Sequence, residues 1–191
     1  MPAIVSALIV ALLVRTFLFQ PFDIPSESNI PSLVVGDYVF VSKTASGDGS
    51  PPQRGDMAVF KLPTDRDIDY VKRVVGLPGD RIQMISGVLN INGVPVKLEE
   101  IQLSPEFYQD RNFRFSRETL PNGRSYVIAD QTADGSADNT DVYVVPAGHY
   151  FTLGDNRDNS QDSRYLNVVG YVSEENFVGP VVLIFWNSNG F

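Results

Sequence analysis

Short segments rich in β-branched and aromatic residues, separated by turn-forming residues, run through most of this 191-residue chain. Turn signals such as Gly76–Asp80 and Asn92-Gly93 divide them. Beyond the N-terminal segment, no helical periodicity of useful length is present, apart from a single turn at residues 173–177. A chain with this pattern is expected to build sheets, so the sequence predicts a mainly β fold. The expected strands are residues 33–43, 57–61, 69–75, 82–85, 88–91, 149–153 and 178–186.

The strand pattern is interrupted by a more polar, less regular stretch in the second half of the chain. Residues 97–146 contain Pro105, Pro121 and several Asp, Asn and Gly residues. We expect a β core formed by residues 21–96 and 147–191, with residues 97–146 as an inserted, variable β subdomain. Residues 44–53 are expected as an exposed loop.

The N-terminus is apolar. Residues 3–14 are almost entirely aliphatic, and Arg15 separates them from further apolar residues. A cleavable secretory signal would need a basic start and a small-residue exit, and neither is present. A buried core helix fits about 12 residues, whereas a membrane helix needs about 20. We expect residues 1–20 to be a membrane anchor, truncated at its beginning, followed by an interfacial segment, with Arg15 at the lipid surface.

Composition excludes several classes of protein. Without cysteine, the chain has no disulfides, no thiolate metal ligands and no cysteine nucleophile. The net charge of −8 argues against nucleic acid as a partner, because an acidic surface repels phosphates.

Two serines, Ser26 and Ser28, lie between Pro25 and Pro31, directly after the apolar N-terminal segment. Taken alone, such serines are more often turn residues that satisfy backbone groups.

Lys72 lies inside an apolar strand, where alternation places it on the face of Tyr70 and Val74. Either Lys72 or Arg73 must therefore point inward, unless the lysine only protects an edge strand. Burial lowers a lysine pKa from about 10.4, and the neutral amine can then act as a base.

Residues 154–164 are dense in Asp and Asn. A calcium loop is one interpretation, but Ser163 and Val169 stand where that loop needs glycine and glutamate. A hydrogen-bonded, capped loop is the simpler interpretation.

Each segment alone is a weak signal, but their order is specific. The chain carries F-x-I-P-S-x-S-x-x-P-x-L-x-x-G-D, then R-G-D-x-x-V-F, D-Y-x-K-R-x-x-G-L-P-G-D and G-D-N-R-D-N-S-x-D-S-R. In this order, after an apolar segment, they resemble the type I signal peptidases. The resemblance covers the chain except residues 44–53 and about 97–145, and it implies the signal-peptidase β fold.

The resemblance also implies site roles. Ser28 matches the nucleophile and Lys72 the general base. Ser26 matches the serine whose hydroxyl forms the oxyanion hole with the Ser28 N–H. Ser160 matches the hydroxyl that orients the lysine amine, and Asp162 and Arg164 match the ion pair that supports this loop. These roles agree with the need of a serine nucleophile for a base and for preset donors.

The resemblance further implies shallow substrate pockets for small side chains at positions −1 and −3. The matching residues are Phe22, Ile24, Asn29, Leu33, Val39, Val59, Tyr70 and Val71, several of which are also expected to pack in the core. Asn29 departs from the family, which usually has methionine there, so the pocket or the activity is expected to differ. Glu27 adds a charge where the family often has a small residue.

On this resemblance, the expected function is removal of N-terminal signal peptides from exported preproteins. The implied location is the bacterial inner membrane, single-pass, with the catalytic domain on the outer side. The expected partners are preprotein signal peptides and membrane lipid, without nucleic acid, and the expected state is a monomer. No metal and no cofactor are expected.

Three rival interpretations remain. A Ser-His-Asp hydrolase has His149 as its one available base, but no nucleophile-elbow motif is present. Self-cleaving repressors share a Ser-Lys pair, but they carry a DNA-binding domain before the protease. A non-catalytic or impaired membrane-anchored β domain could bind peptides by strand addition.

Overall fold

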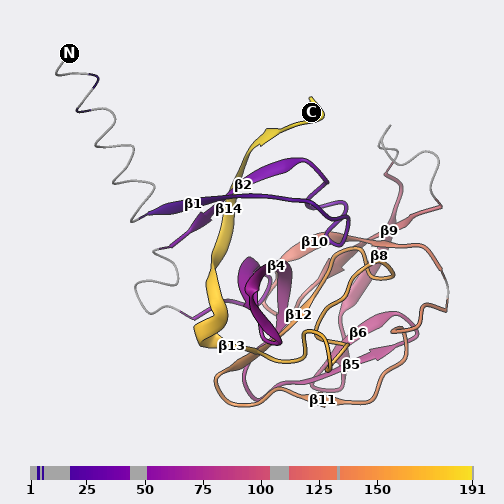
Figure 1. Cartoon of the computed structure of the whole chain (residues 1–191). Helices are drawn as coiled ribbons and strands as arrows, with labels where there is room; N and C mark the ends of the chain where they lie inside the picture. Colours follow the sequence, from indigo (N-terminus) through magenta and orange to yellow (C-terminus); the bar gives the residue numbers. More distant parts are fainter. Residues whose placement is uncertain are drawn as a thin grey trace.

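The computed structural model describes Ile4, Ser6 and residues 18–43, 51–103, 112–132 and 134–190. The described part is mainly β, which confirms the fold class predicted from the sequence. Its strands form three sheets (Figure 1).

The largest sheet has seven strands in the order β1-β2-β14-β3-β4-β12-β13. Their bounds are β1 (Phe19–Asp23), β2 (Asp37–Ser42), β14 (Phe177–Asn187), β3 (Met57–Leu62), β4 (Asp65–Gly76), β12 (His149–Leu153) and β13 (Val172–Ser173). A short 3-10 helix, η2 (Glu174–Asn176), leads from β13 into β14, at the turn that the sequence indicated. Lys72 lies on β4 of this sheet, and Ser28 lies in the segment that connects β1 and β2.

β14 connects the two halves of this sheet. Its first part pairs with β3, with Gly179 opposite Val59, and its second part pairs with β2, with Ile184 opposite Val39. In Figure 1 it is the long yellow strand that crosses β2 and leads to the C-terminal end. Irregular register along β14 accompanies its change of partner.

Two smaller sheets are built from the middle of the chain. One has the order β11-β5-β6-β7, and the other β10-β9-β8. Their bounds are β5 (Arg81–Ile85), β6 (Val88–Ile91), β7 (Val94–Pro95), β8 (Lys97–Ile101), β9 (Arg114–Thr119), β10 (Ser125–Asp130) and β11 (Tyr143–Val144). The β6–β7 turn has positive φ at Asn92 (56°) and Gly93 (81°), as the Asn-Gly signal predicts.

One buried apolar cluster joins the small sheets to the large one. It combines Ile82 and Leu89 of the four-stranded sheet with Ile128 of β10 and with Phe151 and Leu153 of β12. The pairing of β11 with β5 also crosses the expected boundary of the inserted subdomain. The two parts therefore share one core. Their division into a core, residues 21–96 and 147–191, and an inserted subdomain, residues 97–146, stays a prediction.

A second buried cluster lies between β1, β2 and β3. It contains Ile24, Leu33, Val39, Val41 and Val59. The segment that follows β1 is held over this cluster, because Ile24 N donates to Asp37 O (2.8 Å) and Gly36 N donates to Ile24 O (2.9 Å). The cluster thus places residues 24–28 beside the sheet.

The expected anchor, residues 1–20, lies mostly outside the described residues. Within the described part of the chain, no helix is both long enough and apolar enough to cross a membrane. Phe19, which was assigned to the interfacial segment, belongs to β1, and its ring lies 6.1 Å from that of Phe40.

Candidate active site

An open cavity of about 750 Å³ lies between the segment after β1, the middle of β4 and the loop after β12. Pro25 and Ser28 line it from the first segment, Tyr70 and Lys72 from β4, and Ser160 from the loop. Three parts of the chain that are far apart in the sequence therefore meet at one site.

The backbone at Ser28 is held by hydrogen bonds from the loop after β12. The Ser28 carbonyl accepts a hydrogen bond from Asn156 N (3.0 Å), and Asn156 Nδ2 donates to Glu27 O (3.0 Å). The loop after β12 thus fixes the backbone on both sides of the Glu27–Ser28 peptide bond. The Ser26 and Ser28 hydroxyls lie 3.2 Å apart, so one can donate to the other.

Lys72 faces Ser28 from β4. Its Nζ lies 2.6 Å from Ser28 Oγ, and only 4% of the residue is exposed. Strand alternation places Tyr70 on the same face, with its ring centroid 5.1 Å from Nζ. The two residues that the sequence predicts as nucleophile and base are therefore in direct contact.

Burial controls the proton affinity of this amine. Desolvation lowers the pKa of Lys72 from its ordinary value to about 8. The nearby carboxylates of Asp162 and Asp155 oppose this shift, and Arg164 reinforces it. A substantial fraction of the amine is consequently neutral in mildly alkaline solution, and a neutral amine can accept the hydroxyl proton.

The loop after β12 is held by a buried ion pair. Arg164 Nε donates to Asp162 Oδ1 (2.8 Å) and Arg164 Nη2 donates to Oδ2 (2.9 Å). Gly154 N also donates to Asp162 Oδ2 (3.0 Å). Burial alone would raise the pKa of Asp162, but the Arg164 charge and these donors outweigh it and lower the pKa. This geometry agrees with the supporting role that the sequence assigned to Asp162 and Arg164.

Ser160 lines the cavity, but its buried hydroxyl has no hydrogen-bond partner among the described residues. Its role in orienting the Lys72 amine stays a prediction.

Five of the eight residues expected to form the substrate pockets line the cavity: Phe22, Ile24, Val59, Tyr70 and Val71. Leu33 and Val39 are not among its lining residues and pack in the buried cluster behind it. Asn29 also does not line it, because its side chain is fully buried and its Nδ2 donates to Val71 O (2.9 Å). For these three residues, the structure gives a packing or hydrogen-bonding position instead of a place on the cavity wall.

Sequence reasoning missed a second buried ion pair next to the site. Arg73 Nε and Nη2 donate to the two carboxylate oxygens of Asp155 (2.8 and 2.6 Å), and Ser32 Oγ donates to Asp155 Oδ2 (2.5 Å). The sequence contained a sign of this ion pair, because the neighbouring residues Lys72 and Arg73 must point to opposite faces of the strand. Only one of them was expected to face inward, but both are buried, since the opposite face of β4 is also covered.

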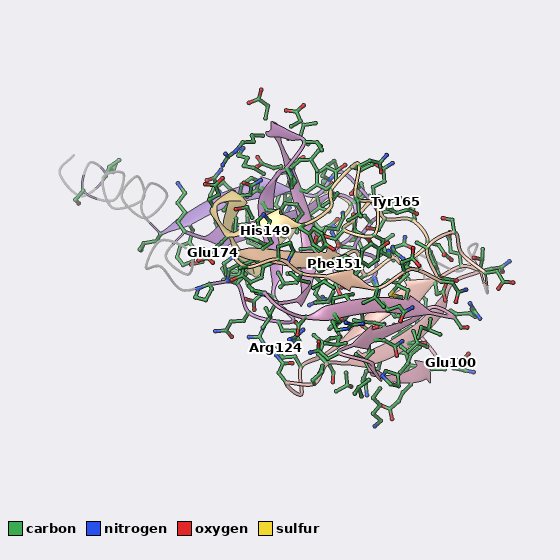
Figure 2. The ribbon with its side chains drawn as sticks, turned by 90° about the horizontal axis from the view of Figure 1, so that it is seen from below. Glu100, Arg124, His149, Phe151, Tyr165 and Glu174 are labelled. Carbon is green, nitrogen blue, oxygen red and sulfur yellow. The ribbon has the colours of Figure 1, made fainter. Side chains whose placement is uncertain are left out.

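His149 is remote from this chemistry. It lies on β12 (Figure 2), its Nδ1 is 2.9 Å from Ala147 O, and it does not line the cavity. The geometry therefore gives no support to a triad that would use the chain's one histidine as base.

Asp158 and Asp162, two carboxylates of the Asp- and Asn-rich residues 154–164, have partners other than a metal ion. Asp158 accepts backbone N–H groups from Gln131 and Thr132 (both 2.8 Å), and Asp162 pairs with Arg164. Within the described ranges, no group of three or more acidic or histidine side chains is arranged to hold a metal ion.

A serine hydroxyl that faces a buried lysine amine in an open cavity is an arrangement found in serine hydrolases that use lysine as base. The model of the signal peptidase family, peptidase S26, matches residues 1–186, and the chain belongs to this family.

Curated relatives agree with the family match. The chain is 37% identical over 206 residues to signal peptidase I of Rickettsia canadensis, with 94% of this chain and 76% of the relative covered. It is 38% identical over 202 residues to signal peptidase I of Rickettsia felis, with 92% and 74% covered. A solved signal peptidase I from Enterococcus faecalis is 29% identical, with a TM-score of 0.41, and the match covers 69% of this chain and 97% of that one.

Proposed function

We propose that this protein is a membrane-bound serine endopeptidase that removes N-terminal signal peptides from exported preproteins, with Ser28 as nucleophile and Lys72 as general base. Family membership supports signal peptide removal by a serine peptidase. The observation that carries the residue assignment is the 2.6 Å separation of Lys72 Nζ and Ser28 Oγ at the edge of an open cavity.

The proposed reaction begins with proton transfer from Ser28 Oγ to the neutral Lys72 amine as Oγ attacks the scissile carbonyl carbon. The Lys72 ammonium then gives this proton to the leaving amine, so that the peptide bond breaks and an acyl-enzyme forms. A water molecule, deprotonated by Lys72, hydrolyses the ester and releases the signal peptide. Every proton transfer in this sequence uses only the two side chains, the substrate and water.

Charge that develops on the carbonyl oxygen needs donors that are already in place. We assign this role to the Ser28 N–H and the Ser26 hydroxyl. The contact of 3.2 Å between the two hydroxyls supports the assignment, because it keeps the Ser26 hydroxyl beside the attacking oxygen.

Specificity for small residues at −1 and −3 is assigned to the apolar part of the cavity wall. Ile24 and Val59 are almost completely buried, and Phe22, Tyr70 and Val71 are partly buried. A wall made by side chains that are themselves packed leaves little room for a large residue.

The membrane location is supported by the exposed end of β14. Residues 182–186 read Val-Leu-Ile-Phe-Trp, and each is between 42% and 56% exposed. Such a continuous apolar surface on a folded domain is typical of a contact with lipid or protein. It is close to the cavity, because Phe22 of β1 lies opposite Val39 of β2, which lies opposite Ile184 of β14. We propose that this surface rests on the outer face of the bacterial inner membrane and that the enzyme acts there as a monomer.

The test is incubation of the purified protein with a preprotein whose signal peptide ends in Ala-x-Ala, followed by mass analysis of the new N-terminus. Cleavage directly after the second alanine is expected, and Ser28→Ala and Lys72→Ala should each abolish nearly all of it. The double variant should be little worse, because the two residues act as a unit.

The alternative is a non-catalytic or impaired peptide-binding domain of the same fold. Binding of the preprotein without cleavage, unchanged in Ser28→Ala, would establish that alternative and exclude the proposed mechanism.

A further inference from the structure

A buried polar group outside the cavity connects the three-stranded sheet with the proposed site. Glu118 of β9 is 0% exposed, and Tyr126 of β10 and Arg157 of the loop after β12 are also buried. Arg157 Nη2 donates to Glu118 Oε1 (2.7 Å), and the Tyr126 hydroxyl donates to the same oxygen. The reaction proposed above uses none of these three groups.

The first connection leads to β4. The Arg73 guanidinium lies 4.0 Å from the centre of the Tyr126 ring, and Arg73 is the next residue after Lys72. Arg73 also binds both oxygens of Asp155, one of the two carboxylates whose charge raises the pKa of Lys72. Tyr126 thus supports the side chain that holds Asp155 in place.

The second connection leads to the loop that lines the cavity. Arg157 Nε donates to Gly154 O (3.1 Å), and Arg157 O accepts from Arg164 Nη2 (2.7 Å). Arg164 in turn binds both oxygens of Asp162, the other carboxylate that acts on Lys72. The two arginines that hold these carboxylates, Arg73 and Arg164, therefore each contact a residue, Tyr126 or Arg157, that binds Glu118.

A contribution to stability does not explain the buried ion pair of Glu118 and Arg157 well. Burial of two charges carries a large desolvation cost, and well-packed apolar replacements of a buried ion pair are often neutral or stabilising. Glu118 Oε2 and Arg157 Nη1 have no hydrogen-bond partner among the described residues, which adds to the cost. A pair that is costly to bury is better explained by the position it imposes on its neighbours.

We propose that Glu118 is a positioning residue for the Ser28–Lys72 pair, acting through Tyr126 and Arg157 on the arginines that hold Asp155 and Asp162. The inference rests on the proposed function. It makes the three-stranded sheet, which lies in the segment expected to be variable, a part of the catalytic framework.

Glu118→Gln is the informative variant, because it keeps the shape of the side chain and removes its charge. Arg157 would then lose its counter-charge, and Asp155 is another carboxylate that already acts on it. Attraction to Arg157 would draw Asp155 away from Lys72. The charged groups that act on Lys72 are Asp155, Asp162 and Arg164, so weaker influence of Asp155 makes its ammonium form less stable.

The measurements are kcat, KM and their pH profiles for a short Ala-x-Ala peptide, per active site titrated with an acylating inhibitor. For Glu118→Gln we expect at least a tenfold fall in kcat, a KM within twofold of the parent, and a rising limb displaced to lower pH. Glu100→Gln is the matched control, since Glu100 is exposed on the neighbouring strand β8 at the periphery of the molecule (Figure 2), and it should match the parent.

The inference would be overturned if Glu118→Gln, measured per titrated active site, had the kcat of the parent and the same rising limb in its pH profile. A purely structural role lowers only the number of active sites. If Glu118→Gln does not fold, Tyr126→Phe decides in the same assay. A parental kcat would refute the proposal, and a fall of several-fold at unchanged KM would support it. Failure of the proposed function is distinct, because then the parent itself does not cleave.

Discussion

At the scale of a single residue, the Asn29 side chain links the two segments that carry Ser28 and Lys72. It directly follows Ser28, and its Nδ2 donates to the carbonyl of Val71, which directly precedes Lys72. The Asn29 side chain is fully buried. The hydrogen bond therefore limits how far Ser28 and Lys72 can move apart, and it gives Asn29 a role different from the pocket role that the family resemblance implied.

Replacement of Asn29 by alanine should remove this restraint without changing the cavity wall. Loss of the hydrogen bond, which leaves the Val71 carbonyl buried, should lower the free energy of unfolding by about 1–3 kcal/mol. We expect kcat to fall about tenfold, on the order of 1.4 kcal/mol in the barrier, while the preference among Ala, Ser and Gly at −1 stays the same. Urea unfolding measures the stability effect, and cleavage of three peptides that differ at −1 measures the others. An altered −1 preference would show that Asn29 contributes to the substrate pocket after all.

Lys72 determines the expected pH dependence. Its pKa is lowered to about 8, and the protonated amine present below that pH cannot accept the Ser28 proton. Activity should therefore rise with pH through an apparent pKa near 8 and stay high above it, until the fold or the substrate is affected. The measurement is kcat/KM from about pH 6 to about pH 10, with His149→Gln as control; loss of the rising limb in that variant would identify histidine as the base.

At the scale of elements, the end of β12 shows how closely the loop after it contacts the nucleophile segment. A Cβ added to Gly154 would lie 2.5 Å from Ser28 O and closer still to Ser160 Oγ. The Ser28 carbonyl is backbone, so it can yield only if the whole segment moves. Glycine at this position lets the loop approach the residue that carries the reacting hydroxyl.

Gly154→Ala is therefore expected to shift Ser28 relative to Lys72. We predict that cleavage slows by a factor of about 100 or more, because a displacement of about 1 Å at a reacting atom has effects of that order. Gly148→Ala is a control for backbone strain without a clash, because Gly148 has a φ of 68° but an added Cβ there meets no atom within 4 Å. Turnover assays on the two variants, with circular dichroism to verify the fold, would contradict the prediction if Gly154→Ala were fully active.

The elements differ in how well their sequence predicted them. Met57–Leu62, His149–Leu153 and Phe177–Asn187 agree closely with the expected strands, because apolar runs bounded by turn residues mark them. An inserted β subdomain was expected in this part of the chain, but β9 and β10 were not located in it, since their polar residues hide the alternation. Glu118 reads as a surface residue although it is buried. The motifs predicted Ser28, Lys72, Asp162 and Arg164 as site residues, whereas Glu118 and Tyr126 were proposed only from contacts between distant segments.

At the scale of the whole molecule, the end of β14 forms a continuous apolar surface that is exposed to solvent. Neighbouring residues on a strand point to opposite faces, so exposure of all five residues 182–186 leaves both faces of β14 open. Aromatic contacts reinforce the region, with Phe185 stacked on Phe40 at 4.2 Å and Trp186 at 4.9 Å from Tyr38. Ordered aromatic groups of this kind favour the boundary between water and lipid.

Replacement of Leu183 and Phe185 by serine should therefore weaken binding to vesicles of zwitterionic lipid by about tenfold or more. Cleavage of a membrane-embedded preprotein should slow more than cleavage of a short soluble peptide. The matched control is Val94→Ser with Val144→Ser, which are at least as exposed but lie on the four-stranded sheet. Vesicle sedimentation that gives the same binding for both double variants would show that β14 does not make the lipid contact.

The place of β14 in the sheet has a consequence for biosynthesis. β1 and β2 lie on one side of it and β3 and β4 on the other, so within this sheet the serine segment and the lysine strand are joined only through β14. A ribosome makes β14 after every other strand of the sheet, and the most recently made residues are still inside its exit tunnel. The growing chain therefore carries Ser28 and Lys72 long before the sheet that unites them can close. In the enzyme proposed above, the Ser28–Lys72 pair would accordingly assemble only after β14 has left the ribosome.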